Sequence, residues 1–430
     1  MPLEKSQIPI KLDTLLLLLL VSAHMWFNPA SNMLIVVCVA IYVALDFIFP
    51  EEPEKSTKSF RYLYLARFSI VMFITLIAAI LPAGLHISQR QATSPENFAH
   101  DGLIQTEIAI EYILEGKNPY TEDYVNTPMA DFPGNEPPFT EAPLYHLAYL
   151  PFLFLGSIPF YLASTSLLGW FDQRIVYLLA FAGALLLLPS LIKNPRDKLA
   201  AIIAIGLNYL FIYFLADGRN DIVILFGLLL TTVLLSRKHI TLSAITLGLT
   251  MATKHQAWLF LPFYLLYLLP HRPQFKDIKK LIYQVWPVAF FFLIIILPFL
   301  FWDAPAFIDD TVTYVSGSGP DSFPMKGWGF STLMLTLGVI PDPEGAFPFI
   351  IFQMLFGLPV FFLMLWRQWK HNTTQHLWAG FAIFAFAFQF FSRFFNDNYF
   401  IFVAQCLVIA LFMFPFQYRQ NEEGQDEGAL

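Results

Sequence analysis

Six carboxylates and a single lysine are gathered in the stretch FAHDGLIQTEIAIEYILEGKNPYTEDY, residues 98–124, which lies between long apolar runs. A carboxylate at such a boundary can act as a general base that deprotonates a hydroxyl group. Asp101, beside Gly102, is either such a base or an ordinary helix cap. Glu107 and Glu111 stand one helical turn apart, which favours a solvated helix face.

The same stretch predicts a helix that lies along the membrane interface. Ser94-Pro95-Glu96 is typical of a helix start, with proline at the first helical position and an acid in the first turn. Apolar residues then recur at helical spacing until Gly116 ends the pattern. The proline-rich stretch 127–143 predicts an irregular return to the membrane. So long a loop is uncommon unless it is functional.

Basic side chains interrupt other apolar runs, where ionisable groups are unfavourable and usually line a site or a pathway. They are Arg219, Lys254, His255 and Arg393. Phosphate oxygens favour paired cationic donors, so these side chains are candidates for binding a phosphate. Each also has a simpler interpretation: Lys254 can extend to the membrane interface, and His255 can be merely its polar neighbour.

The composition places these residues in a membrane protein. Of the 430 residues, 57% are hydrophobic and 13% are charged, whereas a soluble domain carries about 25% charged residues. Segments that can cross about 30 Å of hydrocarbon predict an all-α polytopic protein with about 11–13 transmembrane helices. The two cysteines favour neither a disulfide framework nor a metal–thiolate site. The formal charge of −7 gives no support for a nucleic-acid partner.

The predicted spans are 13–27, 33–50, 62–84, 175–192, 199–216, 222–236, 281–302, 346–366, 374–391 and 399–416. Two further apolar runs, 143–171 and 240–270, are too long for one span and are interrupted, which predicts broken helices that enter and return on one side. Within the first span, Leu15–Leu20 followed by Val21-Ser22-Ala23 imitates the apolar region and the cleavage site of a signal peptide. A second span follows closely, so we favour a retained anchor.

Lysine and arginine clusters between the spans predict the cytoplasmic side. Six segments then fall on the opposite, outer face: 86–142, 172–174, 217–221, 254–255, 303–345 and 393–398. The acidic stretch and the basic interruptions therefore belong to one face. We predict a single polar cavity at the outer leaflet.

Several motifs in this order resemble a known enzyme family. Asp101-Gly102 opening a juxtamembrane helix, Glu115–Tyr120 (EGKNPY) and Ala142–Tyr145 (APLY) resemble the first outer loop of GT-C glycosyltransferases. Ala216–Asp221 (ADGRND) stands where those proteins carry a Gly-Gln-x-Asn-like turn, and Ala252–Trp258 (ATKHQAW) is similar to their lysine-containing helix break. The resemblance covers roughly residues 62–410 and is greatest to the polyprenol-phosphate-mannose-dependent mannosyltransferases of glycosyltransferase family 87.

The resemblance implies an enzyme that moves a sugar, mannose in the nearest relatives, from a polyprenyl phosphate to an outer-face glycan or glycolipid. It implies that Asp101 is the catalytic base and that the lipid phosphate is bound by Lys254, assisted by Arg219, His255 and Arg393. One in-line attack would invert the anomeric carbon. Arg219 takes the place usually held by glutamine, so the donor sugar stays open.

The remaining predicted site residues bind the acceptor. They are Glu107, Tyr120 and Trp328, the last in a flexible aromatic loop that suits a lid or an acceptor-binding rim. The acid pairs Glu122-Asp123 and Asp309-Asp310 have no histidine nearby in the sequence, and a lipid-phosphate leaving group is already activated. We therefore predict no metal and no cofactor.

The chain divides into an N-terminal pair of extra helices (1–58), a GT-C-like module with the outer loop 86–142 (59–302), a C-terminal module with the outer loop 303–345 (303–416) and an acidic cytoplasmic tail (417–430). We expect a multi-pass protein of the plasma membrane, with its active site on the non-cytoplasmic face. Membrane lipids are its other expected partners. A transporter is less favoured because no inverted repeat is evident, and a flippase or polymerase of lipid-linked polysaccharide is the closer alternative.

Overall fold

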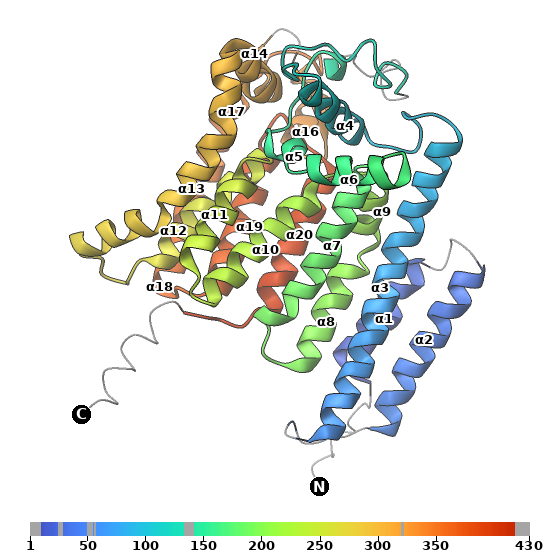
Figure 1. The fold of residues 1–430 in the computed structure, drawn as a ribbon. Coiled ribbons are helices and arrows are strands. Elements are labelled where there is room, and N and C mark those ends of the chain that lie inside the picture. The colour runs from blue at the N-terminus through green and yellow to red at the C-terminus, as the bar shows by residue number, and fades with distance from the viewer. Residues whose placement is uncertain are drawn as a thin grey trace.

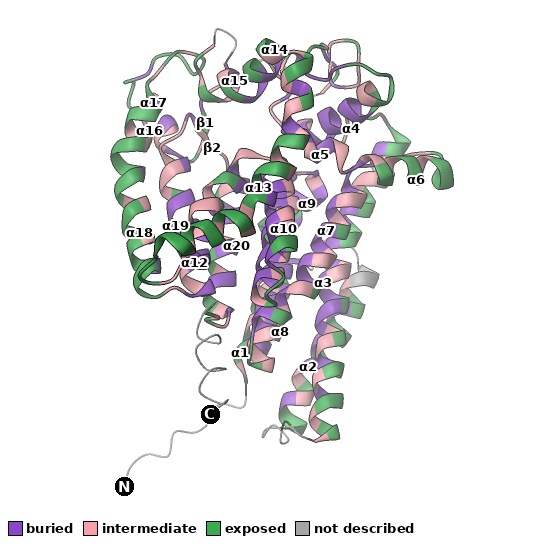
Figure 2. Ribbon diagram, turned by 60° about the vertical axis from the view of Figure 1, so that its left-hand side comes forward, coloured by how far each residue is buried: buried purple, intermediate pink, exposed green. Residues whose placement is uncertain are grey.

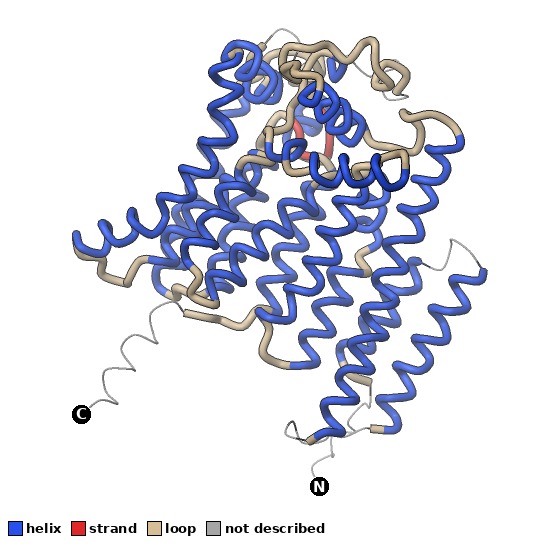
Figure 3. The backbone as a smooth tube through the Cα atoms, viewed as in Figure 1, coloured by secondary structure: helices blue, strands red, loops and turns tan. Residues whose placement is uncertain are grey.

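The computed structural model describes residues 10–24, 29–49, 55, 57–132, 142–319 and 322–417. Within these residues the regular structure is helical apart from two short strands, β1 (Lys326–Gly327) and β2 (Phe394–Phe395), which pair in parallel (Figure 3). The all-α prediction is confirmed. Most of the predicted acidic tail, residues 418–430, lies outside the described residues.

Long apolar helices form the body of the molecule, as predicted for a polytopic membrane protein. Four segments are long and apolar enough to cross a membrane: α3 (Lys58–Ala92), α7 (Arg174–Leu187) with η4 (Leu188–Leu191), α13 (Phe275–Trp302), and α17 (Phe349–Phe352) continued through η7 (Gln353–Gly357) into α18 (Leu358–Lys370). A fifth candidate span is the pair α8 (Pro195–Gly206) and α9 (Tyr209–Asp217), bent by 50° where Asn208 caps the second helix.

Shorter helices complete the bundle beside these spans (Figure 1). They are α1 (Leu12–Val21) with η1 (Ser22–His24), α2 (Pro29–Ile48), α10 (Asp221–Ser236), α11 (Ile240–Met251), α12 (Leu261–Leu268), α19 (Thr374–Phe390) and α20 (Asp397–Phe412). Buried residues concentrate where helices face one another, while α18 presents exposed apolar side chains on its outward face (Figure 2). Such a face suits a lipid environment, which is as apolar as the side chains themselves.

Both interrupted apolar runs are broken, as their sequences predict. The run 240–270 divides into α11, η5 (His255–Phe260) and α12, with Lys254 in extended backbone at the break. The run 143–171 gives η3 (Ala142–Leu144), α5 (Phe152–Leu155) and α6 (Ile158–Leu168). The two breaks meet, because the Leu150 and Phe152 amides donate to the Thr253 and Ala252 carbonyls. These bonds satisfy carbonyls that a helix end leaves open.

One end of the bundle, here called the loop end, carries α4 (Asp101–Leu114), α5, α6, α14 (Ala304–Ile308), the π-helix η6 (Asp309–Thr313), α15 (Tyr314–Ser316) and α16 (Phe330–Thr336) (Figure 1). The helix expected from Ser94 begins only at Asp101, because residues 95–98 form turns and His100 caps the helix with extended backbone. Asp101 therefore opens α4. A Cβ at Gly102 would lie 2.0 Å from the Tyr149 hydroxyl, so the next position requires glycine.

A buried ion network joins the N-terminal helices to the rest of the bundle. Asp46 of α2 accepts hydrogen bonds from Arg67 of α3 (2.7 Å) and Arg196 of α8 (2.8 Å), and Arg196 also bonds to Asp13 of α1 (2.7 Å). The Tyr42 hydroxyl donates to the same Asp13. Two carboxylates and two guanidinium groups thus neutralise one another at the junction of four helices.

Replacing Asp46 by alanine should destabilise this junction. Both arginines would lose a carboxylate partner while Arg67 stays buried, and removing one member of a buried pair typically costs about 3–5 kcal/mol. We expect a lower thermal unfolding midpoint for the purified protein in detergent. The control is Glu115→Ala, which removes an exposed carboxylate at the loop end and should leave the midpoint almost unchanged. Equal midpoints for the two variants would refute a stabilising network.

Candidate functional site

A cavity of about 280 Å³ lies at the loop end and draws its lining from distant parts of the chain. The lining comes from the start of α4, the break before η5, the turn between α9 and α10, the loop 303–345 and the turn between α19 and α20. Four of the residues predicted from the sequence line it together: Asp101, Arg219, Lys254 and His255. This cavity brings together the predicted base and three of the predicted phosphate ligands, and a second cavity of about 310 Å³ is lined by Arg90, Glu107 and Glu111.

Asp101 stands at the N-terminus of α4 with its carboxylate facing positive charge. Its Oδ1 lies 2.6 Å from His100 Nδ1 and accepts from the Gly102 amide at 2.5 Å. Burial alone would raise the pKa of this carboxyl, but His100, Lys326 and the Gly102 amide together hold the pKa well below its usual range. Asp101 is therefore ionised and able to accept a proton.

Lys254 reaches the cavity from the helix break. Its ammonium group donates to Asp221 (2.9 Å) and Asn220 (3.0 Å) at the start of α10 and lies 4.7 Å from the centre of the Tyr399 ring. The Asn398 side-chain amide donates to the other carboxylate oxygen of Asp221. Both oxygens of Asp221 are therefore hydrogen-bonded, one to Asn398 and one to Lys254. The arrangement holds a buried cation in one orientation.

Arg219 forms a second cationic centre in the turn between α9 and α10. Its guanidinium group donates to Asp217 (3.1 Å) and to Asp397 (2.5 Å), and it lies 4.3 Å from the Phe214 ring. A third cation, Lys326 of β1, lines the same cavity. Sequence reasoning placed the loop around Lys326 near the site but did not select this residue, because only the pairing of β1 with β2 brings it to the cavity.

Several buried polar atoms of the lining have no hydrogen-bond partner among the described residues. They are Nε2 of His255, both amide atoms of Gln256 and Oε1 of Gln389. The His255 ring packs on Trp258, with 4.7 Å between ring centres. Buried polar groups are nearly always paired, so these atoms are available to bind water or a polar ligand.

Arg393, the fourth predicted phosphate ligand, lies outside this lining. Its guanidinium group donates to the carbonyl groups of Phe323, Pro343, Glu344 and Gly345. It thereby ties the loop 303–345 to the turn after α19.

The three predicted acceptor-binding residues also lie outside the cavity lining. Tyr120 is buried in an aromatic cluster and donates its hydroxyl to the Tyr149 carbonyl at 2.8 Å. Trp328 is 59% exposed. Its backbone amide donates to the carbonyl of Phe395, which lies in the same strand, β2, as the cavity residue Phe394. Glu107 belongs to an ion network described next. Three possible metal ligands, His146, Asp309 and Asp310, likewise lie next to lining residues rather than among them.

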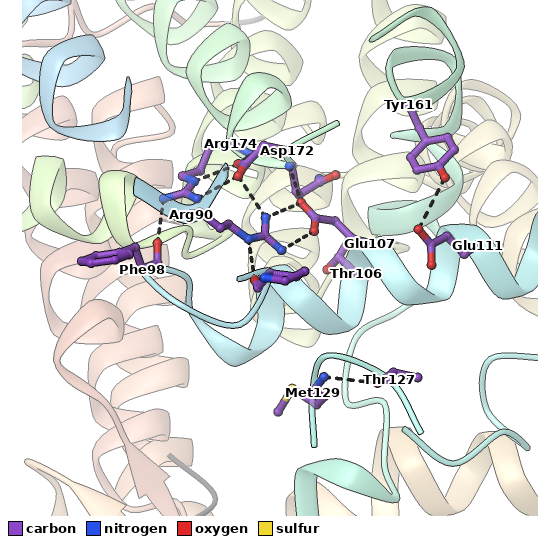
Figure 4. Close-up of polar contacts among 12 residues, drawn as sticks. Arg90, Phe98, Thr106, Glu107, Glu111, Thr127, Met129, Tyr161, Asp172 and Arg174 are labelled. Carbon is purple, nitrogen blue, oxygen red and sulfur yellow. Dashed lines mark hydrogen bonds and ion pairs between the residues drawn. The ribbon is translucent and has the colours of Figure 1, made fainter. Parts of the chain in front are cut away.

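The ion network around Glu107 fixes α4 against the bundle (Figure 4). Arg90, at the end of α3, donates to both oxygens of Glu107 (2.7 and 3.0 Å) and to Asp172 (2.9 Å). Asp172 also binds Arg174, whose guanidinium group reaches the carbonyls of Phe98 (2.9 Å) and Ala216 (3.0 Å). The chain just before Asp101 is therefore held against the end of α9.

The fold and the cavity define a class: a multi-pass membrane protein with a cavity lined by charged side chains at one end of its helical bundle. Residues 136–417, well over half of the chain, match the family model of glycosyltransferase family 87. The chain belongs to this family and is a membrane glycosyltransferase. No curated protein and no solved structure shows a significant match. Asp101 and the rest of α4 precede the matched residues, so its role rests on its position in the cavity and on the motifs of the first loop.

Glu107→Gln should loosen α4, because the neutral amide cannot retain both charge-assisted bonds to Arg90, each worth about 1.5–3 kcal/mol. Hydrogen exchange followed by mass spectrometry should show at least tenfold faster exchange of the α4 amides. The control is Glu111→Gln, one turn further along; among the described residues, the partner of this carboxylate is the Tyr161 hydroxyl at 3.5 Å. Equal exchange in the two variants would show that the network does not hold α4.

Proposed function

We propose that this glycosyltransferase moves a sugar, in the first instance mannose, from a polyprenyl phosphate to the hydroxyl group of a glycan or glycolipid acceptor. The observation that carries the proposal is the cavity itself. Its lining combines one ionised carboxylate, Asp101, with three cations, Arg219, Lys254 and Lys326, and with polar atoms that have no partner among the described residues. A sugar phosphate needs all three features: a base for the acceptor, cations for the phosphate and hydrogen-bond partners for the sugar.

The charge of the lining supports an anionic donor. Asp217, Asp221 and Asp397 balance Arg219 and Lys254 from behind, and none of these three carboxylates lines the cavity. The surface that a ligand meets therefore carries more positive than negative charge. Charge-assisted hydrogen bonds from lysine and arginine are the usual means of holding a phosphate.

An apolar groove supports a lipid carrier. About 400 Å³ of space lies between α5, α6, α7, α10 and α11, lined almost entirely by apolar side chains and small residues such as Gly156, Ala180 and Gly227. Its lining reaches Thr253, the residue directly before the cavity residue Lys254. A prenyl chain in this groove would bring its phosphate to the lysine. The exposed Leu179 and Phe160 leave the groove open to surrounding lipid.

The proposed reaction is a single displacement. Asp101 takes the proton of the acceptor hydroxyl as its oxygen bonds to the anomeric carbon, and the bond from that carbon to the phosphate oxygen breaks. The phosphate leaves with the bonding electron pair, and Lys254 and Arg219 stabilise its added charge. Attack opposite the leaving group inverts the anomeric configuration.

The setting we propose is the non-cytoplasmic face of the cell membrane, because the lysine and arginine clusters of the short loops favour the opposite side as cytoplasmic. Membership of a glycosyltransferase family favours sugar transfer over the two alternatives, a transporter and a flippase or polymerase of lipid-linked polysaccharide.

Transfer of radiolabelled mannose from polyprenyl phosphate mannose by the purified protein tests the proposal. Asp101→Asn should lower the rate by about 10²–10⁴-fold, the usual contribution of a general base. Lys254→Met should instead raise KM for the donor more than it lowers kcat. Asp123→Asn, an exposed acid of the same loop, is the control. A fully active Asp101→Asn protein would exclude Asp101 as the base, and no transfer from any polyprenyl phosphate sugar would exclude the donor.

The pH profile gives a second test. Because the pKa of Asp101 lies below its usual range, the base stays ionised down to mildly acidic pH. The acid limb of kcat/KM due to Asp101 should lie below the ordinary aspartate pKa of about 4. His100→Ala removes a neighbour that lowers this pKa, so the limb should move to higher pH. An unchanged profile in His100→Ala would show that this residue does not tune the base.

A further inference from the structure

Buried carboxylates in the described part of the chain follow a clear rule, and one residue departs from it. Asp13, Asp46, Asp172 and Asp221 each form an ion pair with an arginine or a lysine. Asp310 is also buried, with 3% of its surface exposed, yet within the described residues its ion-pair partner is an imidazole, that of His146. A buried carboxylate is unfavourable unless a positive charge compensates it, so this position favours the binding of a cation.

A second carboxylate makes the requirement stronger. Asp310 Oδ1 lies 2.9 Å from His146 Nδ1, and Asp309 Oδ2 lies 3.8 Å from the same nitrogen. Consecutive residues of an ordinary α-helix point in different directions. Here both belong to the π-helix η6, and their oxygens converge on one imidazole. Even a protonated imidazole would leave this cluster with a net negative charge.

The rest of the cluster is already arranged. The second oxygen of Asp310 accepts from the Leu147 amide at 2.8 Å, and Asp309 Oδ1 accepts from the Thr313 hydroxyl at 2.7 Å. The His146 ring stacks on Tyr314, with 4.3 Å between ring centres. These contacts hold one oxygen of each aspartate in place and leave the other directed to the shared position. The ligand atoms all lie within 4.8 Å of one another.

We propose that His146, Asp309 and Asp310 bind one divalent cation of the Mn²⁺ or Mg²⁺ class. One imidazole nitrogen and two carboxylate oxygens suit such hard or intermediate metals. Ligands about 2.1 Å from an octahedral metal lie roughly 3 Å apart when adjacent and about 4 Å apart when opposite. The separations of 2.9 and 3.8 Å fall in this range. Three protein ligands leave the remaining positions for water or a ligand oxygen.

The cation would stabilise one wall of the catalytic cavity. His146 belongs to the segment that leads to Ala148 and Tyr149, and η6 leads through Tyr314 to Val315. All three of Ala148, Tyr149 and Val315 line the cavity. A metal shared by the two segments fixes the loop 303–345 to the segment that follows η3 without entering the reaction. The sequence prediction of no metal assumed no histidine near Asp309-Asp310, and the structure supplies one from 163 residues away.

Manganese binding to the purified, chelator-treated full-length protein tests this site directly. Electron paramagnetic resonance should show one saturable Mn²⁺ per chain, with nitrogen hyperfine coupling from the imidazole. Asp309→Asn keeps an oxygen for Thr313 and should weaken binding at least tenfold, while His146→Gln should abolish the nitrogen coupling. Asp123→Asn, an exposed acid of the first outer loop, should bind as the wild type does.

Two results would overturn the proposal: no saturable Mn²⁺ binding by the wild type, or equal affinity in the wild type and Asp309→Asn. The second outcome would leave His146 and Asp310 as a simple hydrogen-bonded pair. The measurement needs no sugar donor, so its failure is distinct from a failure of the proposed transfer reaction.

Discussion

The position of Asp101, the proposed base, depends on four charges that do not line the cavity. Arg90, Glu107, Asp172 and Arg174 neutralise one another where α3, α4 and α7 meet (Figure 4). Charges taken out of water are unfavourable unless they are paired in good geometry, so this set tolerates little displacement of any member. Through Arg174 the same set holds the Phe98 carbonyl, three residues before Asp101. A loop at the membrane surface thereby becomes a rigid part of the site.

The bilayer explains why the opposite side of the cavity is built from broken helices. A lysine within a continuous transmembrane helix would have to be neutralised inside hydrocarbon. At the break between α11 and η5, Lys254 instead meets Asp221 and Asn220 at the start of another helix. The carbonyls freed by the break accept from the amides of Leu150 and Phe152. Irregular backbone at membrane depth is tolerated where protein satisfies it in this way, and the segment that does so also supplies the cavity residue Tyr149.

The sequence predicted the general plan because polar residues inside apolar runs are informative. Four ionisable residues stand out because they lie beside or within apolar runs: Asp101, Arg219, Lys254 and His255. The predicted alternation of spans placed all four on one face. The sequence does not show in which direction a side chain points. Arg393 interrupts an apolar run just as Arg219 does, but its guanidinium group donates to main-chain carbonyls of residues 343–345. Contacts between distant segments were also hidden. Lys326 and His146 reach their partners only through pairings that span more than 60 residues, and no local pattern encodes these.

In the reaction that we propose, the electrostatics of the cavity couple the donor to the base. In the free protein, His100 and Lys326 stabilise the charged form of Asp101 and so make it a weak base. A phosphate bound by Arg219 and Lys254 brings negative charge into the same low-dielectric space, where charges act over several ångströms. That charge opposes the effect of Lys326 and raises the proton affinity of Asp101. The carboxylate becomes a better base only when the donor is in place, which links deprotonation of the acceptor to the presence of the sugar it will receive.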